Sequence, residues 1–140
     1  MTSLKILAVG DIMLGDQELK LGSGVASVIR RKGVDYIFKE VKPVFQNADI
    51  VFGNLEAILS DKNFTPERLL SASFRGGPDS IEGLKRAGMN TLAVANNHVM
   101  NHGEEAFFDS IRLLRKSDFN IVGLASPGGG SRPEVISDRK

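Results

Sequence analysis

The chain has 140 residues and a formal net charge of +1, from 18 basic and 17 acidic side chains. This length is enough for one domain with its own hydrophobic core, and the balanced charge argues against a nucleic-acid-binding surface, which needs clustered basic residues. The sequence contains no cysteine, so any metal site would have to use oxygen and nitrogen ligands. No apolar run reaches the ~18 residues that a membrane-spanning helix needs, and residues 1–5 lack the apolar stretch of a signal peptide. We therefore expect no membrane segment and, by default, a cytoplasmic chain.

Strand and helix patterns alternate along the chain. Short apolar runs predict four strands, at residues 4–10, 50–53, 89–95 and 119–123, and the first alternates poorly, as expected of a strand buried on both faces. Helices are predicted at residues 25–31, 35–46 and 103–116, and a further helix begins after residues 74–79 and ends at Gly88. Pro43 removes a backbone hydrogen bond inside its segment, so a kink or two short helices are expected there. The alternation predicts an α/β fold with a largely parallel sheet and right-handed crossovers.

Three segments are expected to be loops. Residues 12–24 contain three glycines, residues 60–73 are polar, and residues 126–133 have the glycine, proline and serine composition of a loop. Residues 134–140 then resemble the start of an incomplete strand. We therefore expect residues 1–140 to form a single partial domain, either the front half of a larger fold or a half-domain that completes itself by pairing.

Metal-capable side chains follow three of the predicted strands: Asp11 after the first, Asn54 and Glu56 after the second, and Asn96, Asn97 and His98 after the third. Because the carboxyl ends of parallel strands share one edge of a sheet, we expect these groups to converge. Carboxylate and amide oxygens with one imidazole suit Mn, Mg, Fe or Zn better than soft metals. Two such ions would polarise a phosphoryl oxygen and activate a bridging water, and Glu56 has two oxygens with which to bridge them.

Each of these residues also has an ordinary structural interpretation. Asp11 precedes a glycine-rich loop and can form an Asx turn, and Glu56 can be a surface or capping residue. Asn97 is typical of turns and caps, and His98 can be a structural histidine. Their joint occurrence at three successive strand ends favours the metal site.

Two further residues lie near these positions. Arg75, before Gly76 and Gly77, can hold an anionic ligand near the N-terminus of the following helix, or it can form a structural salt bridge. His102 lies in the loop before a helix and can equally face solvent. The sequence contains neither the dinucleotide fingerprint nor a nucleophile elbow, so a nicotinamide cofactor and a serine or cysteine nucleophile are not expected.

Four motifs resemble those of a known family. They are residues 10–15 (GDIMLG), 48–56 (ADIVFGNLE), 74–76 (FRG) and 95–105 (ANNHVMNHGEE). In this order and spacing they resemble the poly-γ-glutamate capsule biosynthesis proteins of the CapA type, over about residues 4–136. That family is similar in turn to calcineurin-like metallophosphoesterases, whose fold is a sandwich of two β-sheets flanked by helices, with a two-metal site at one edge.

The resemblance implies a fold and a set of residue roles. The chain would be the N-terminal half of a four-layer αββα metallophosphoesterase-like sandwich. The metal-site residues that the resemblance implies are Asp11, Asn54, Glu56, Asn97 and His98, of which Asp11 and His98 would also be catalytic. Residues that would bind an anion or support the ligands are Arg75, Asn96, Asn101 and His102.

The sequence departs from the family pattern in two ways. The family usually carries an aspartate three residues after the motif histidine, whereas this chain has Asn101, which keeps a hydrogen-bonding oxygen but loses the charge. The metallophosphoesterase pattern also needs histidines from the second half of the domain, and this chain has only His98 and His102. One copy of the chain is therefore expected to hold divalent metal ions weakly.

The sequence leaves three functions open. The first is a CapA-type role in poly-γ-glutamate biosynthesis or export, with the capsule polymer as partner; members of that family are often membrane-anchored and extracellular. The second is a metal-dependent phosphoesterase or other hydrolase that acts on a phosphoester. The third is a non-catalytic half-domain that binds a partner or dimerises through an unpaired sheet edge.

Overall fold

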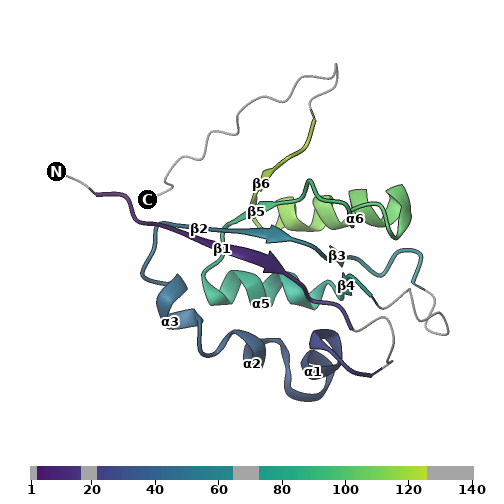
Figure 1. Ribbon diagram of the computed structural model, residues 1–140, viewed down its shortest axis with the longest axis horizontal. Helices are drawn as coiled ribbons and strands as arrows, with labels where there is room; N and C mark the ends of the chain where they lie inside the picture. Colours follow the sequence, from purple (N-terminus) through teal and green to yellow (C-terminus); the bar gives the residue numbers. More distant parts are fainter. Residues whose placement is uncertain (1–2, 17–21, 65–72, 126–140) are drawn as a thin grey trace.

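The protein is an α/β fold built on one parallel sheet (Figure 1). The computed structural model describes residues 3–16, 22–64 and 73–125. Its four-stranded sheet has the order β1-β2-β5-β6, and all three neighbouring pairs are parallel. The strands are β1 (Ile6–Ile12), β2 (Ile50–Leu55), β5 (Thr91–Ala93) and β6 (Asn120–Val122). The predicted fold class and the parallel sheet are thus confirmed.

The helices occupy the segments where the sequence pattern places them. They are α1 (Val25–Lys32), α2 (Val34–Phe38), α3 (Lys42–Phe45), α5 (Asp79–Ala87) and α6 (Gly103–Lys116). The predicted helix that contains Pro43 is two short helices, α2 and α3, because proline is tolerated at the start of α3 but not inside a continuous helix. Gly88 ends α5 in the left-handed conformation, with a φ of 107° that other residues rarely adopt.

The hydrophobic core of the described residues lies between the sheet and the helices. Val51, Leu55 and Leu92 of the sheet are at most 3% exposed and join one cluster with Leu84 of α5 and Leu114 of α6. The strands follow one another in chain order across the sheet, and crossovers between parallel strands are right-handed, so α5 and α6 cover the same face. Figure 1 shows α1, α2 and α3 on the side of the sheet where α5 lies.

The opposite face of the sheet is open in the part of the chain that the structure describes. Ile6 of β1 is 64% exposed, and Phe52, Ala93 and Val122 on the neighbouring strands are only half-buried. The prediction that the first strand is buried on both faces is therefore wrong, because the described helices pack on one side only.

Two other predictions about the elements need correction. A second, two-stranded parallel sheet pairs β3 (Ile58–Leu59), where no element was predicted, with β4 (Arg75–Gly76), which lies in the segment 74–79 that was expected to be a turn before a helix. The third strand is also shorter than predicted, since β5 ends at Ala93. Residues 65–72 of the predicted polar loop and the whole tail, residues 126–140, lie outside the described residues.

The packing of α5 against α2 depends on Gly83. A Cβ atom at this position would collide with the side chain of Val34, whose branched Cβ leaves it little freedom to move away. The close approach of α2 therefore explains why a glycine, with its poor helix propensity, lies inside α5.

We predict that Gly83→Ala lowers the free energy of unfolding. Overpacking costs about 1–3 kcal/mol, which exceeds the gain of about 1 kcal/mol in helix propensity. Denaturant unfolding of the parent, Gly83→Ala, Val34→Ala and the double variant would measure this. The double variant should be less destabilised than the sum of the single changes, whereas a Gly83→Ala protein more stable than the parent would contradict the packing argument.

Candidate functional site

The pairing of β1 with β2 brings the first two predicted strand ends together. Asp11 is the register partner of Asn54, and the register shifts between Ala8 and Asp11, as at a β-bulge. Asp11 is therefore the last residue but one of β1 rather than a residue beyond the strand, and it is exposed. Bulges of this kind re-aim side chains and are common beside functional sites.

A chain of side-chain hydrogen bonds then links the three strand ends. The Nδ2 atom of Asn54 donates to Oδ1 of Asp11 (2.8 Å) and to Oε1 of Glu56 (3.3 Å). The Nδ2 atom of Asn96 donates to Oδ1 of Asn54 (3.2 Å) and to the carbonyl of Leu55 (2.9 Å). Asn96 in turn accepts a hydrogen bond from the backbone N–H of His98 (3.0 Å). Residues separated by up to 87 positions thus share one hydrogen-bonded edge of the sheet.

The charge at this edge is unbalanced. Asp11 and Glu56 share a single amide donor, and neither forms an ion pair with any described residue. The described residues contain no group of three or more histidine, aspartate or glutamate side chains able to hold a metal ion. The edge therefore offers two carboxylates supported by amides rather than a closed cage of charged ligands.

The imidazole of His98 is held from three sides. Its ring stacks on Phe74, with 3.7 Å between ring centroids and 8° between the planes. The Nδ2 atoms of Asn97 and Asn101 lie 3.0 Å from Nε2 and Nδ1, respectively. Phe74 has a positive φ of 50°, which is uncommon for residues other than glycine.

The two contacts to the His98 ring constrain its protonation. A neutral imidazole has one donor and one acceptor nitrogen, so both amide groups cannot donate to it at once. If the oxygen of Asn101 accepts a hydrogen bond from Nδ1–H, Nε2 is the nitrogen that keeps its lone pair. Asn101 can therefore orient the ring as a carboxylate would, but without adding a negative charge.

The hydrogen bonds of His102 and Arg75 go to backbone carbonyls outside the hydrogen-bond chain of the Asp11 edge. The Nε2 atom of His102 lies 2.9 Å from the carbonyl oxygen of Ser73, so that nitrogen must carry the proton. Arg75 is 4% exposed, and its Nη1 atom donates to the carbonyls of Ser60 (2.6 Å) and Lys62 (2.8 Å). Of the two roles left open for Arg75, the structural salt bridge does not occur among the described residues, where its hydrogen bonds go to backbone carbonyls.

A buried polar cluster around Asp16 was not predicted from the sequence. Asp16 is 6% exposed and accepts hydrogen bonds from the backbone N–H of Ser27 (2.7 Å), the Ser27 hydroxyl (2.6 Å) and Nη2 of Arg30 (2.7 Å). Burial raises the pKa of Asp16, but the hydrogen bonds from Ser27 and the charge and hydrogen bond of Arg30 outweigh it and bring the pKa below 3.8. The one available sequence signal was the spacing of Ser27 and Arg30, which places both on one face of a helix.

Residues 5–139 match the family described as bacterial capsule synthesis protein PGA_cap. The chain belongs to this family. One relative is the capsule biosynthesis protein CapA of Bacillus anthracis, 31% identical over 122 residues, which are 86% of the PGA_cap chain and 28% of that relative. Another is the PGA biosynthesis protein CapA of Bacillus subtilis (strain 168), 31% identical over 115 residues, which are 82% of the chain and 28% of that relative. The predicted resemblance to the CapA type is therefore confirmed.

More distant relatives match a similar portion. The uncharacterized protein y4sH of Sinorhizobium fredii (strain NBRC 101917 / NGR234) is 29% identical over 106 residues, which are 73% of the PGA_cap chain and 22% of that protein. The chain thus spans less than a third of the length of the curated relatives it matches. Among the helices that the structure describes, none combines the length and the apolar character needed to cross a membrane.

We predict that His102 makes the stability of the PGA_cap chain depend on pH. Burial lowers its pKa below 6.5, a lowering that the Arg75 charge reinforces and the bond to the Ser73 carbonyl opposes. The unfolded chain then binds the proton more readily, so stability should fall as the pH drops below about 6.5 toward the pKa of the folded state.

Denaturant unfolding at about pH 7.5 and about pH 5.5 would measure the effect. His102→Gln keeps a side-chain N–H donor but cannot titrate, so its unfolding free energy should change less between the two pH values. An equal change in the parent and in His102→Gln would show that another group is responsible.

Proposed function

We propose that this chain is part of a capsule biosynthesis protein that acts in the formation or export of poly-γ-glutamate, and that its Asp11 edge holds a divalent metal ion. Membership of the PGA_cap family supports the role in capsule biosynthesis. The observation that supports the metal ion is the pair of carboxylates, Asp11 and Glu56, which share one amide donor and have no basic partner among the described residues.

The donor chemistry at this edge fits a hard divalent cation. Asp11 and Glu56 supply carboxylate oxygens, which suit Mg, Mn, Fe or Zn, and the Nε2 atom of His98 supplies a nitrogen once the amide of Asn97 moves away. When bound, such an ion would polarise a phosphoryl or carbonyl oxygen and promote ionisation of a water molecule. That Asn54 and Asn97 also contact the metal ion stays a prediction.

The chain's own side chains have separate tasks in this proposal. Asn54 spaces the two carboxylates, and Asn96 ties Asn54 to the backbone of His98, so that the edge is organised before an ion arrives. Asn101 and Phe74 hold the imidazole plane, so that His98 can hold or move a proton at Nε2. A metal-dependent phosphoesterase activity of the longer protein is the alternative use of the same groups.

We predict that Asp11→Ala weakens Mn²⁺ binding by at least about tenfold, because it removes one of two carboxylates. Calorimetric titration of the 140-residue chain would measure this. Asp35→Ala is the matched control, since Asp35 is an exposed carboxylate that pairs with Arg86 on the helical side of the molecule. Equal Mn²⁺ affinity in the parent and both variants would place the metal elsewhere.

The same variants in a longer form of the protein distinguish the two activities. Mn²⁺-stimulated turnover of a phosphoester that is lost in Asp11→Ala and retained in Asp35→Ala would favour the phosphoesterase. Metal-dependent cleavage or release of γ-glutamyl polymer with the same pattern would favour the capsule-polymer role. If Asp11→Ala still turns over both the phosphoester and the polymer, this edge has no role in either reaction.

We also propose that the 140-residue chain associates with itself through β1 and the open face of the sheet. β1 is an edge strand of the described sheet, and it begins beside Leu4, which is 55% exposed, with Ile6 at 64%. Exposed edges with apolar side chains favour strand pairing between copies.

We predict that the parent chain dimerises at micromolar concentration and that Ile6→Lys shifts it to the monomer, because a charge on an edge strand opposes pairing. Sedimentation equilibrium would measure the association. Val44→Lys serves as the control, since Val44 is also exposed (55%) but lies in α3 on the helical side. A parent that is monomeric at every concentration would refute the proposal.

A further inference from the structure

The loop after β5 contacts two successive residues of the segment that leads into β4. The Nε2 atom of His102 donates a hydrogen bond to the carbonyl oxygen of Ser73 (2.9 Å), and the ring of His98 stacks on Phe74. These are the two histidines of the sequence. Both therefore join the loop to the same short segment.

The side chain of Phe74 does not pack in the hydrophobic core. Phe74 is half-buried, and among the described residues it belongs neither to the core cluster nor to the apolar side chains packed against that cluster. Its one aromatic partner among these residues is the imidazole of His98. Core packing therefore does not explain an aromatic side chain at this position.

The backbone holds Phe74 in an unfavourable conformation. A φ of 50° is costly for a residue with a Cβ atom, and it persists only where the surrounding structure fixes it. The carbonyl of Phe74 accepts a hydrogen bond from the backbone N–H of Ile58 (2.8 Å), and the carbonyl of Ser73 is bonded to His102. The loop and β3 thus hold this residue from both sides.

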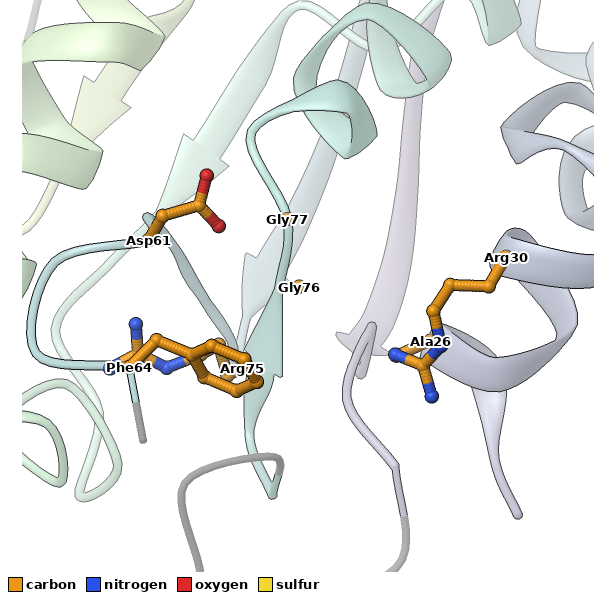
Figure 2. A pocket seen from close by; sticks show the side chains of 7 residues that line it. All are labelled: Ala26, Arg30, Asp61, Phe64, Arg75, Gly76 and Gly77. Atoms are coloured by element: carbon orange, nitrogen blue, oxygen red, sulfur yellow. The ribbon is translucent and has the colours of Figure 1, made fainter. Parts of the chain in front are cut away.

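Arg75 anchors the segment after Phe74. Arg75 is 4% exposed, and its Nη1 atom donates to two backbone carbonyls of the turn after β3. Figure 2 shows its side chain on the side of β4 where Phe64 lies, directed away from Arg30. Ser73 and Arg75 are both buried and hydrogen-bonded, so Phe74 between them has little freedom to move.

The stack has a geometry that favours an electron-poor imidazole. The ring centroids are 3.7 Å apart and the planes differ by 8°, so the rings lie almost directly over one another at contact distance. Neutral aromatic pairs prefer an offset or edge-to-face arrangement, because their negative faces repel. A positively polarised group over the face of a phenylalanine is instead attracted. A divalent cation on Nε2 would withdraw electron density from the imidazole of His98 and so strengthen its contact with Phe74.

We propose that Phe74 is a positioning residue that favours the metal-bound form of His98, and that His102 secures Phe74 through Ser73. The stack fixes the ring plane, which contains the lone pair of Nε2, and it is strongest when a cation shares that lone pair. By linkage, an ion on Nε2 should in turn stabilise the segment that carries Phe74. The inference rests on the proposed function in taking His98 as a ligand.

Proton NMR of the metal-free 140-residue chain tests the stack itself. Protons above the face of a benzene ring resonate upfield, so the ring protons of His98 should lie upfield of those of free histidine. His102→Gln removes the other histidine and so identifies the His98 signals. Phe74→Leu should return these signals to ordinary positions, whereas Phe74→Tyr should keep them upfield. Ordinary positions in the parent would overturn the proposal.

Calorimetric titration with Mn²⁺ tests the link to metal binding. Phe74→Leu should weaken binding at least about threefold, because the attraction to a cationic ring is lost, and Phe74→Tyr should keep most of the affinity. Both variants retain a Cβ atom at the positive φ, so the backbone strain is unchanged. Phe108→Leu is the matched control, since Phe108 is 61% exposed on α6 and contacts Phe107. Its affinity should change less than about twofold.

A double-variant cycle tests whether His102 acts through Phe74. His102→Phe keeps a ring but removes the N–H donor to Ser73, so it should weaken Mn²⁺ binding at least about twofold. In the Phe74→Leu background the same change should have little further effect. His102→Gln, which keeps a donor, should bind nearly as tightly as the parent. Additive losses would overturn the role given to His102.

The outcomes separate this inference from the proposed function. Equal Mn²⁺ affinity in the parent and Phe74→Leu, with binding weakened in Asp11→Ala, would overturn the role of Phe74 and keep the metal site. Weaker binding in Phe74→Leu but not in Asp11→Ala would keep Phe74 as the support of a His98 ligand and place the metal away from Asp11. No Mn²⁺ binding by the parent at millimolar concentration would overturn both.

Discussion

The parallel pairing of β1 with β2 is the constraint on which the rest of the structure depends. Parallel pairing places the carboxyl ends of strands at one edge of the sheet, and the register sets Asp11 beside Asn54. A shift of one residue would move Asp11 to the other side of the pleat and break its bond to Asn54. The core packs closely against the backbone of Gly53, since a Cβ atom there would lie 2.5 Å from the end of the Ile12 side chain and 3.0 Å from that of Met89. The core and the candidate site thus depend on the same strand pair.

Amide side chains organise the Asp11 edge. Asn54 and Asn96 bond to one another and to the carboxylates or backbone around them, and Asn97 and Asn101 contact the His98 ring. Amides can fix the positions of anionic groups without adding charge. The negative charge of the two carboxylates is therefore not neutralised by described residues, which is the electrostatic condition that a cation site requires. Beside β4, two buried donors of Arg75, Nε and Nη2, have no hydrogen-bond partner among the described residues.

The sheet has one covered face because of its strand order. Four strands that follow one another in chain order, joined by right-handed crossovers, place α5 and α6 together on one side. The other face, which includes Ile6 and Phe52, carries apolar side chains that the described helices do not cover. The chain spans 28% of the length of the CapA relatives that it matches. The described residues thus position the Asp11 edge on one covered face of the sheet. They leave the other, apolar face uncovered.

The sequence by itself determined the local elements and the edge at which the candidate residues gather. The periodicity predicted both ends of α6, and Gly88 and Pro43 indicated where helices end or begin. The ends of the predicted strands pointed to Asp11, Asn54 and His98. All these signals act within a few residues of the chain. Only the tertiary structure decided which face of the described sheet is open, that β3 pairs with β4, and that Phe74 stacks on His98. It also decided that Arg75 is buried, with two donors that no described residue bonds. Each of these depends on contacts between residues far apart in the chain, and such packing leaves no periodic trace in one sequence.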